Sequence, residues 1–325
     1  MKPFFKITAA IVLLGICFIT ACIKEHDPIL PSTTNPIHYS MNWFHSQFGS
    51  PIQTYTVNAS SGGTFTTPQG TKIIVPANDF MNTSYQLVTG TVTIQFKDIY
   101  TKSDMVLNDV APVGYNYNYY VPFNSGGEFF IKALNGASPL YVVGSPIKII
   151  QPLNGWAMDK NMAAISGAKD SAGRVGWLAD STSNKVIDTT LPGYVFSLYQ
   201  FSNPVDSGSW CNSDNTNYFS SYTQTSFTIQ TTDSVDANNS NVFLLFTGVN
   251  SMVHVYYGYS GVGTYPYNYA PQGLSCTIVL LEVTNKGQLK SAFVPTTITT
   301  NGTINVTATL TTEANFKTQL ATYNH

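Results

Sequence analysis

Arginine is almost absent from this chain, in which Arg174 is the only one among 325 residues. Lysine and arginine together number 15 against 17 aspartates and glutamates, and charged residues make up 10% of the sequence. Nucleic acid is therefore not an expected partner, because neutralising phosphates requires clustered basic side chains. The polar surface must come instead from threonine, serine, asparagine and tyrosine, a composition typical of β-rich exported proteins.

The motifs of the common catalytic centres are missing as well. His-Glu-x-x-His and Gly-x-Ser-x-Gly do not occur, and the glycines at 258–263 precede no expected helix. A zinc site needs closely spaced ligands, whereas the histidines of the body stand apart, at His38, His45, His254 and His325.

A glycosidase needs only two carboxylates at a suitable separation, which a sequence cannot reveal. The acids considered for that role have the setting of ordinary strand ends and loops; they are Asp98, Asp104, Asp109 and Glu128. The sequence therefore favours a protein that is not an enzyme. No catalytic residue, metal site or dissociable cofactor is assigned.

Cysteine is scarce too, with four in the whole chain. Beyond the N-terminal region, the two that remain are Cys211 and Cys276. Outside the cytoplasm a disulfide between them is chemically allowed, but a sequence cannot establish the Cα separation that a bridge needs. A bridge and two separate buried thiols both stay open.

The N-terminus has the organisation of an exported lipoprotein. Two lysines precede an apolar stretch at 7–20 that is too short to span a bilayer comfortably. Ile19-Thr20-Ala21-Cys22 resembles the bacterial lipobox. The resemblance implies that residues 1–21 are a signal peptide, and that Cys22 carries diacylglycerol on its thiol and an acyl chain such as palmitate on its new amine. Such chains anchor firmly, since each buried methylene contributes about 0.8 kcal/mol.

Residues 22–40 form the expected lipidated tether. The cluster Lys24-Glu25-His26-Asp27 is similar to the export signals that send Bacteroidota lipoproteins to the cell surface, and the prolines after it favour an extended spacer. We therefore expect a lipid anchor in the outer membrane with the body exposed at the cell surface. No further long apolar run occurs, so no transmembrane helix is expected after the anchor.

Alternation of apolar and polar residues dominates the body of the chain, and helical periodicity is scarce. In the segment 91–97, for example, Val92, Ile94 and Phe96 are expected to point into a core. Further strands are predicted at 128–133, 146–151, 194–201, 226–231, 242–246, 251–257, 277–283, 289–294 and 303–310.

Turn and helix signals are few. Asn285-Lys286-Gly287 is expected to join two strands in a hairpin. The one predicted helix covers 313–321, near the C-terminus, and is capped by Thr311 or Thr312.

The most informative stretch is a glycine- and proline-punctuated pair of strands. Gly62-Gly63-Thr64-Phe65 opens it, an apolar strand ends at Pro76, and a second long strand follows Gly90. This pattern resembles the ZU5-like β-domain of ankyrins, netrin receptors and many Bacteroidota lipoproteins. The resemblance covers 57–152 and implies a ZU5-like β-domain over 41–152. The His-Phe-Ser triplet at which some members cleave themselves is missing, so autoproteolysis is not expected.

The second half also looks like those lipoproteins. Trp210-Cys211-Asn212-Ser213-Asp214 is similar to a Trp-x-Asn-Cys-Asp box of that group, with the cysteine displaced. The predicted fold is therefore all-β, with two tandem β-sandwich-like domains at 41–152 and 153–325. The second includes the short C-terminal helix.

One loop concentrates oxygen ligands. Asp233, Asp236, Asn238, Asn239 and Asn241 could hold calcium, but they lack the Asp-x-Asp-x-Asp-Gly spacing of a strong calcium loop. Asp and Asn are also favoured turn residues, so an ordinary turn is the preferred interpretation.

Clustered tyrosines are the most suggestive feature. Tyr115, Tyr117 and Tyr119 repeat every second residue and share one face if they form a strand. The segment 256–269 is expected to be a loop whose rings could stack on sugars. Its candidate ligand-binding residues are Tyr257, Tyr259, Tyr265, Tyr267 and Tyr269. For the first group, packing inside the sandwich is the preferred interpretation; for the second, covering a sheet edge is the competing one.

These observations predict a lipid-anchored envelope protein with a non-catalytic binding role, a glycan being the favoured ligand. The alternatives are a structural or assembly scaffold of an outer-membrane complex and a glycan-active hydrolase. The expected partners are the membrane, through the anchor, and a glycan or other envelope proteins.

The anchor can be tested directly. Cys22→Ala removes the thiol that lipidation requires, so we expect loss of radiolabelled palmitate incorporation and release of the protein from the membrane fraction. A variant that still takes up label and sediments with membranes would contradict the lipobox assignment.

Overall fold

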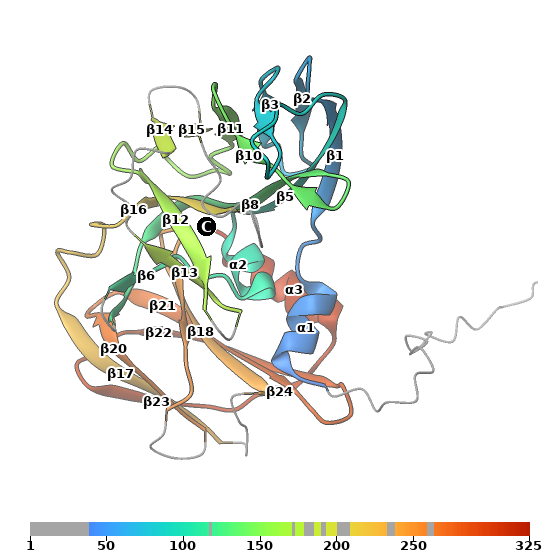
Figure 1. The fold of residues 1–325 in the computed structure, drawn as a ribbon. Helices are drawn as coiled ribbons and strands as arrows, with labels where there is room; N and C mark the ends of the chain where they lie inside the picture. Colours follow the sequence, from blue (N-terminus) through green and yellow to red (C-terminus); the bar gives the residue numbers. More distant parts are fainter. Residues whose placement is uncertain are drawn as a thin grey trace, which may run out of the picture. The chain divides into compact units, whose positions relative to one another are not determined.

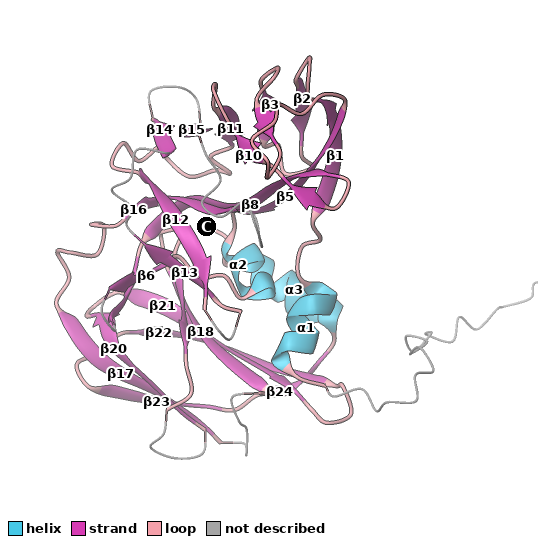
Figure 2. Ribbon diagram, in the orientation of Figure 1, coloured by secondary structure: helices cyan, strands magenta, loops and turns pink. Residues whose placement is uncertain are grey.

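The computed structural model describes residues 39–116, 119–170, 173–178, 185–189, 193–199, 209–232, 238–258 and 263–325. Within them strands predominate, arranged in several sheets, and three helices occur (Figure 2). The prediction of an all-β chain with a short C-terminal helix is confirmed. None of the helices in this part of the chain has the length and apolar character of a membrane span. The predicted leader, its Cys22 and nearly all of the tether lie outside the described residues.

A nine-stranded sheet runs through the upper part of Figure 1. Its strands are antiparallel except for one parallel bridge between β13 and β6. In order across the sheet they are β1 (Gln53–Asn58), β5 (Thr91–Ile99), β8 (Asn124–Asn135), β16 (Ser209–Asn215), β12 (Ala163–Lys169), β13 (Val175–Leu178), β6 (Val113–Asn116) and β7 (Tyr119–Pro122), with β9 (Ser138–Pro139) paired to β8.

A second sheet covers one face of the first and completes a sandwich. Its strands, in order, are β14 (Lys185–Asp188), β15 (Tyr194–Leu198), β11 (Ile147–Gln151), β3 (Lys72–Val75) and β2 (Gly63–Thr66), and a small pair, β4 (Phe80–Met81) and β10 (Tyr141–Val142), lies beside it. The core between the sheets includes Ile94, Phe129 and Phe196. Val92, Ile94 and Phe96 are fully buried on β5, which confirms the predicted inward face of that strand.

A second sandwich forms the lower part of Figure 1. One sheet is β20 (Thr264–Pro271), β17 (Gln224–Thr231) and β23 (Gly302–Val306); the other is β19 (Met252–Val255), β18 (Ser240–Phe246), β21 (Ser275–Val283), β22 (Leu289–Thr297) and β24 (Thr309–Thr311). The predicted turn at 285–287 joins β21 to β22, and Gly287 supplies the positive φ of 74° that such a turn needs. The core of this sandwich includes Phe227, Leu244 and Ile278.

Three short helices share a third core with the two sandwiches: α1 (Met41–Phe48), α2 (Lys102–Asn108) and α3 (Glu313–Ala321). Phe44, Met105 and Phe316 from these helices belong to one cluster with Phe130 of β8 and Val279 of β21. That core therefore lies on the opposite faces of the two sheets from the sandwich cores. The helices sit where the sandwiches meet (Figure 1).

The predicted helix at 313–321 is confirmed, and Thr312 is its N-cap. The other two helices were not predicted. α2 begins with a capping box in which the Thr101 hydroxyl accepts from the Asp104 backbone while the Asp104 carboxylate accepts from the Thr101 backbone. With eight and seven residues, α1 and α2 are too short for a clear helical period in the sequence.

The division predicted between residues 152 and 153 does not coincide with a division between the sheets. β12, β13 and β16 follow that point in the sequence, yet they belong to the same sheet as β1, β5 and β8. β14 and β15 likewise extend the sheet of β11. The chain from residue 38 onward clusters as one unit.

Cys211 and Cys276 are separate buried thiols and form no disulfide. Cys211 belongs to the core of the first sandwich and Cys276 to that of the second. Burial raises the pKa of the Cys276 thiol to about 12, so this thiol stays protonated and unreactive at neutral pH.

Glu128 and Asp214 are fully buried carboxyl groups on the neighbouring strands β8 and β16. Asn212 Nδ2 donates to Asp214 Oδ2 at 2.6 Å and to Glu128 Oε1 at 3.4 Å. Burial raises the pKa of both groups well above the usual values, and the Asp214 charge raises that of Glu128 further. Glu128 is thus a core residue, not the ordinary strand-end or loop acid that its sequence context suggested.

The raised pKa of Glu128 makes stability depend on pH. The folded protein keeps the Glu128 proton, whereas the unfolded chain releases it above about pH 4.3. The contribution of this group to the free energy of unfolding is therefore complete below that pH, and it is lost as the pH rises through the raised pKa. Glu128→Gln keeps the shape without the titration. Its free energy of unfolding at pH 8 should exceed that of the native protein by about 1 kcal/mol or more.

Urea denaturation at pH 4 and pH 8 measures this difference. Glu313→Gln, which changes an exposed carboxylate on α3, is the matched control and should leave the pH dependence intact. A Glu128→Gln protein that loses stability towards alkaline pH as steeply as the native one would contradict the assignment.

Candidate functional site

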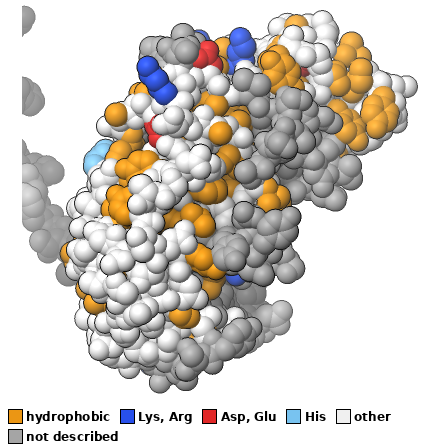
Figure 3. Space-filling view, turned by 90° about the vertical axis from the view of Figure 1, so that its left-hand side faces the viewer, with side chains coloured by type: hydrophobic (Ala, Val, Ile, Leu, Met, Phe, Trp, Pro, Cys, Tyr) orange, Lys and Arg blue, Asp and Glu red, His pale blue; other side chains and the backbone are white. Residues whose placement is uncertain are grey.

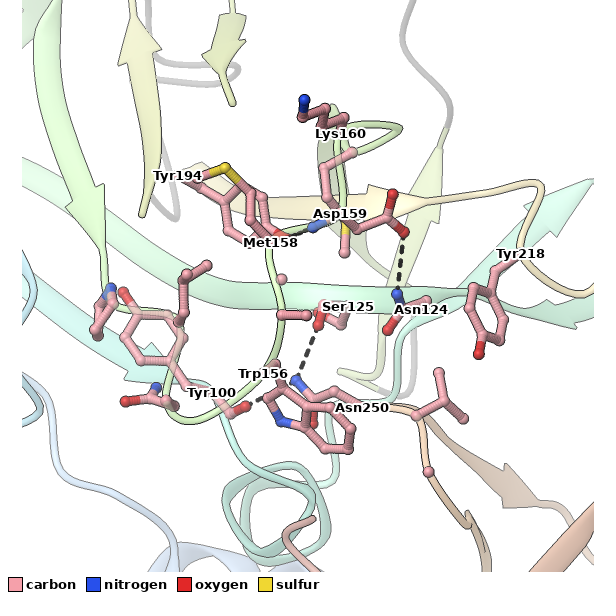
Figure 4. A pocket seen from close by; sticks show the side chains of 18 residues that line it. Tyr100, Asn124, Ser125, Trp156, Met158, Asp159, Lys160, Tyr194, Tyr218 and Asn250 are labelled. Atoms are coloured by element: carbon pink, nitrogen blue, oxygen red, sulfur yellow. Dashed lines mark hydrogen bonds between the residues drawn. The ribbon is translucent and has the colours of Figure 1, made fainter. Parts of the chain in front are cut away.

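A cavity with a volume of about 330 Å³ lies where the two sandwiches meet (Figure 4). Six segments build it: the residue after β5, the start of β8, the loop 152–162 after β11, the start of β15 (Tyr194), the loop after β16 (Tyr218), and the turn 248–250 between β18 and β19. We call this cavity the junction pocket.

Aromatic rings line the junction pocket. Trp156 is half-buried on the loop after β11, Tyr194 is buried at the start of β15, and Tyr218 is 37% exposed. Figure 4 shows Tyr194 and Tyr218 on opposite sides of the pair Asn124 and Asp159. The pocket therefore combines apolar ring surface with a polar centre.

Two glycines at the start of β8 allow the chain to pass beneath these rings. A Cβ atom on Gly126 would lie 2.6 Å from the Tyr194 ring, and one on Gly127 would lie 2.3 Å from the Tyr100 ring. Gly127 also has a φ of +128°, which other residues rarely adopt. Larger residues here would displace the aromatic walls.

Asp159 is held in place by three hydrogen bonds to its carboxylate. Oδ2 accepts from Asn124 Nδ2 at 3.2 Å and from Asn215 Nδ2 at 2.8 Å, while Oδ1 accepts from the Asn161 backbone at 2.9 Å. The Asp159 backbone N–H in turn donates to the Tyr194 hydroxyl at 2.8 Å. These bonds fix the carboxylate as an acceptor at the centre of the pocket.

Lys102 lies behind Trp156 and is only 1% exposed. Its ammonium donates to the carbonyls of Phe246 and Val249 at 2.8 and 3.2 Å, and it sits 5.5 Å from the centre of the Trp156 ring. Burial lowers the pKa of Lys102 to about 8. The side chain therefore joins α2 to the turn that carries one wall of the pocket and supports the indole from behind.

A buried hydrogen-bond network supports Tyr100, another wall residue. The Tyr100 hydroxyl and the Thr71 hydroxyl are 2.7 Å apart, and Asp98 Oδ2 accepts from Thr67 at 2.6 Å and from Thr71 at 3.1 Å. Burial, reinforced by the Asp98 charge, raises the pKa of Tyr100 beyond the range in which it could ionise. Tyr100 is thus a neutral, fixed element of the pocket.

The tyrosines predicted to bind sugars do not form an exposed platform. Residues 264–271 form strand β20 instead of a loop, and this strand buries Tyr265 at 1% and Tyr267 at 5% exposure in the core of the second sandwich. Tyr257 and Tyr269 are half-buried against the same core. The alternation of this segment was obscured by its glycines and prolines, and burial of its rings overrides the stacking interpretation. Tyr259 lies outside the described residues.

The predicted tyrosine stripe and calcium loop each lie only partly within the described residues. Tyr115 and Tyr119 lie on the paired strands β6 and β7, and Tyr117 lies outside the described residues. In the acidic loop, 233–237 is not described, whereas Asn241 Nδ2 lies 2.8 Å from His45 Nε2. Among the described residues, no three His, Cys, Asp or Glu side chains gather as a metal site would require.

His254 is not isolated, as the sequence suggested, but pairs with Asp109 at 2.6 Å. Burial alone would raise the pKa of Asp109, yet the charge and hydrogen bond of His254, together with the charges of His45 and Arg174, hold that pKa below its usual value. Asp109 is the C-cap of α2, so the pair ties this helix to β19. The His254–Asp109 pair therefore has a structural role.

Sequence reasoning missed the residues of the junction pocket because they come from segments far apart in the chain. Asn124, Trp156 and Asn250 carry no shared motif or spacing. The one usable signal was a tryptophan after Asn154-Gly155, in a turn that follows a predicted strand. Neither a family model nor a curated protein matches the chain.

The contact between Lys102 and Trp156 predicts a spectroscopic titration. The ammonium is charged below about pH 8 and neutral above it, so its field on the indole changes across that pH. We expect one component of the tryptophan emission to titrate near pH 8 in the native protein. That component should vanish in Lys102→Met and in Trp156→Phe, whereas a midpoint near the ordinary lysine value of about 10.4 would contradict the burial of Lys102.

Proposed function

We propose that the protein is a lipid-anchored outer-membrane protein, attached through Cys22, that binds a glycan in the junction pocket without transforming it. The observation that carries this proposal is the combination of Trp156 and Tyr218 with the fixed polar groups of Asn124 and Asp159 in one cavity. The ZU5-like resemblance of the first half is compatible with such a role but does not specify it.

The chemistry of the junction pocket suits a sugar. Sugar rings present apolar faces, which stack on aromatic side chains, and hydroxyl edges, which need fixed hydrogen-bonding partners. A volume of about 330 Å³ lies at the low end of the range of about 300–1,000 Å³ usual for small-ligand sites. A short oligosaccharide segment is therefore a suitable occupant.

Binding is favoured over hydrolysis because the described lining has one carboxylate, Asp159. Glycoside hydrolysis usually requires two carboxyl groups about 5–9.5 Å apart, one of them protonated. Asp159 is held by three hydrogen bonds to its carboxylate oxygens, which position it as a hydrogen-bond acceptor. Glu128 and Asp214 are sealed in the core and do not line the pocket.

A scaffold role remains a second candidate because of an exposed apolar group elsewhere. Tyr85 is 73% and Leu87 is 49% exposed, and the Tyr85 ring stacks on Tyr141 with 5.5 Å between ring centres. On the face drawn in Figure 3, hydrophobic side chains form small groups among polar atoms. Cross-linking in intact cells that depends on Tyr85 and not on Trp156 would favour this role.

A glycan array probed with the purified full chain in detergent tests the binding proposal. For any glycan that binds, Trp156→Ala should weaken affinity about fivefold or more, since ring stacking contributes on the order of 1 kcal/mol. Tyr85→Ala removes an exposed ring outside the pocket and is the matched control. Absence of binding to every glycan, or equal affinity of the folded Trp156→Ala protein, would overturn the proposal.

A further inference from the structure

We infer that the junction pocket selects a neutral or amine-bearing sugar and rejects its acidic counterpart. This inference rests on the proposed function and names the class of ligand. Two groups in the pocket carry it: a buried acceptor on Asn250 that lacks a donor, and the carboxylate of Asp159.

Asn250 presents an unmatched hydrogen-bond acceptor. Its Nδ2 group donates to the backbone carbonyls of Tyr100 and Ser125, both at 2.9 Å. Because two carbonyls hold the amide nitrogen, the orientation of the side chain is fixed (Figure 4). Oδ1 is buried in a residue that is 2% exposed, and it has no donor among the described residues.

An unmatched acceptor in a pocket wall determines what a ligand must bring. A hydroxyl or N–H group that reaches Asn250 Oδ1 would satisfy it, whereas a carboxylate group at the same position offers only further acceptors. Leaving a buried polar atom unpaired is unfavourable, so a ligand that supplies the donor is preferred over one that cannot.

Asp159 adds an electrostatic preference in the same direction. In the described residues no lysine or arginine forms an ion pair with its carboxylate; its three partners are two side-chain amides and a backbone N–H. A ligand carboxylate placed nearby would meet a like charge, which specific sites use to exclude wrong partners. An amino group on the ligand would instead be attracted.

The two lysines near the pocket do not offset this preference. The Lys102 ammonium is engaged by two carbonyls behind Trp156. Lys160 is exposed at the rim, and Figure 4 shows its side chain directed away from Asn124 and Asn250.

The experiment uses calorimetry on the full chain in detergent with matched tetrasaccharides. For each of the gluco, galacto and manno configurations, the probes are the neutral β-1,4-linked sugar, its 2-amino form and its 6-carboxylate form. We expect a neutral or amino member to bind at least tenfold more tightly than the carboxylate of the same backbone. Equal or tighter binding of the carboxylate would overturn the inference while leaving glycan binding intact. If none of the probes binds, the inference falls, and the glycan array decides separately on the proposed function.

A charge variant separates electrostatics from shape. Asp159→Asn keeps the size of the side chain, so the affinity for the acidic sugar should rise at least tenfold towards that for the neutral one. Asp170→Asn removes a carboxylate outside the pocket, where it pairs with Arg174. This control should leave the ratio of the affinities for the neutral and the acidic sugar unchanged. An unchanged ratio in Asp159→Asn would overturn the inference.

Salt provides a second measurement that does not rely on the fold of a variant. Raising the ionic strength should reduce the difference in affinity between acidic and neutral sugars in the native protein, because screening weakens the repulsion by Asp159. An affinity difference that does not change with salt would also contradict an electrostatic origin of the selectivity.

Discussion

The centre of the nine-stranded sheet, at β8 and β16, is buried on both faces, and this constraint governs the rest of the structure. On β8, Phe129 points into the core of the first sandwich while the next residue, Phe130, points into the core shared with the helices. All seven residues of β16 are buried. A polar side chain in such a sheet cannot reach bulk water, so it must find its partner inside the protein.

The junction pocket lies at the start of β8, where buried polar side chains of the sheet form hydrogen bonds inside the protein. Ser213, facing one core, donates to Gln151, which donates to the Gly127 carbonyl. On the opposite face, the Ser125 hydroxyl donates to Asn212. These bonds hold the start of β8 in place, and its glycines leave room for the rings above it. The same polar groups that satisfy the buried sheet thus shape the wall of the cavity.

Sequence patterns predicted the elements of this fold better than their assembly. Alternation on β5 and the turn before β22 depend on neighbouring residues, so they could be derived locally. The pairing of β16 with β8 depends on chain segments about eighty residues apart, which no local pattern encodes. The tyrosines of β20 illustrate the same limit, since whether a ring is exposed or buried is decided by the sheet beneath it. The site was missed for that reason: its parts meet only in the folded chain.

The position of the pocket at the junction supports the proposed binding role. Its walls come from both sandwiches, since Ser125 belongs to the first and Asn250 to a turn of the second, and Asn250 joins them through two backbone carbonyls. Lys102 adds a third connection from α2. A cavity held from several sides keeps its donors and acceptors fixed before a ligand arrives, which lowers the entropic cost of binding. Among the described residues of the lining, the carboxylate of Asp159 is held by three hydrogen bonds, an arrangement suited to orienting a ligand.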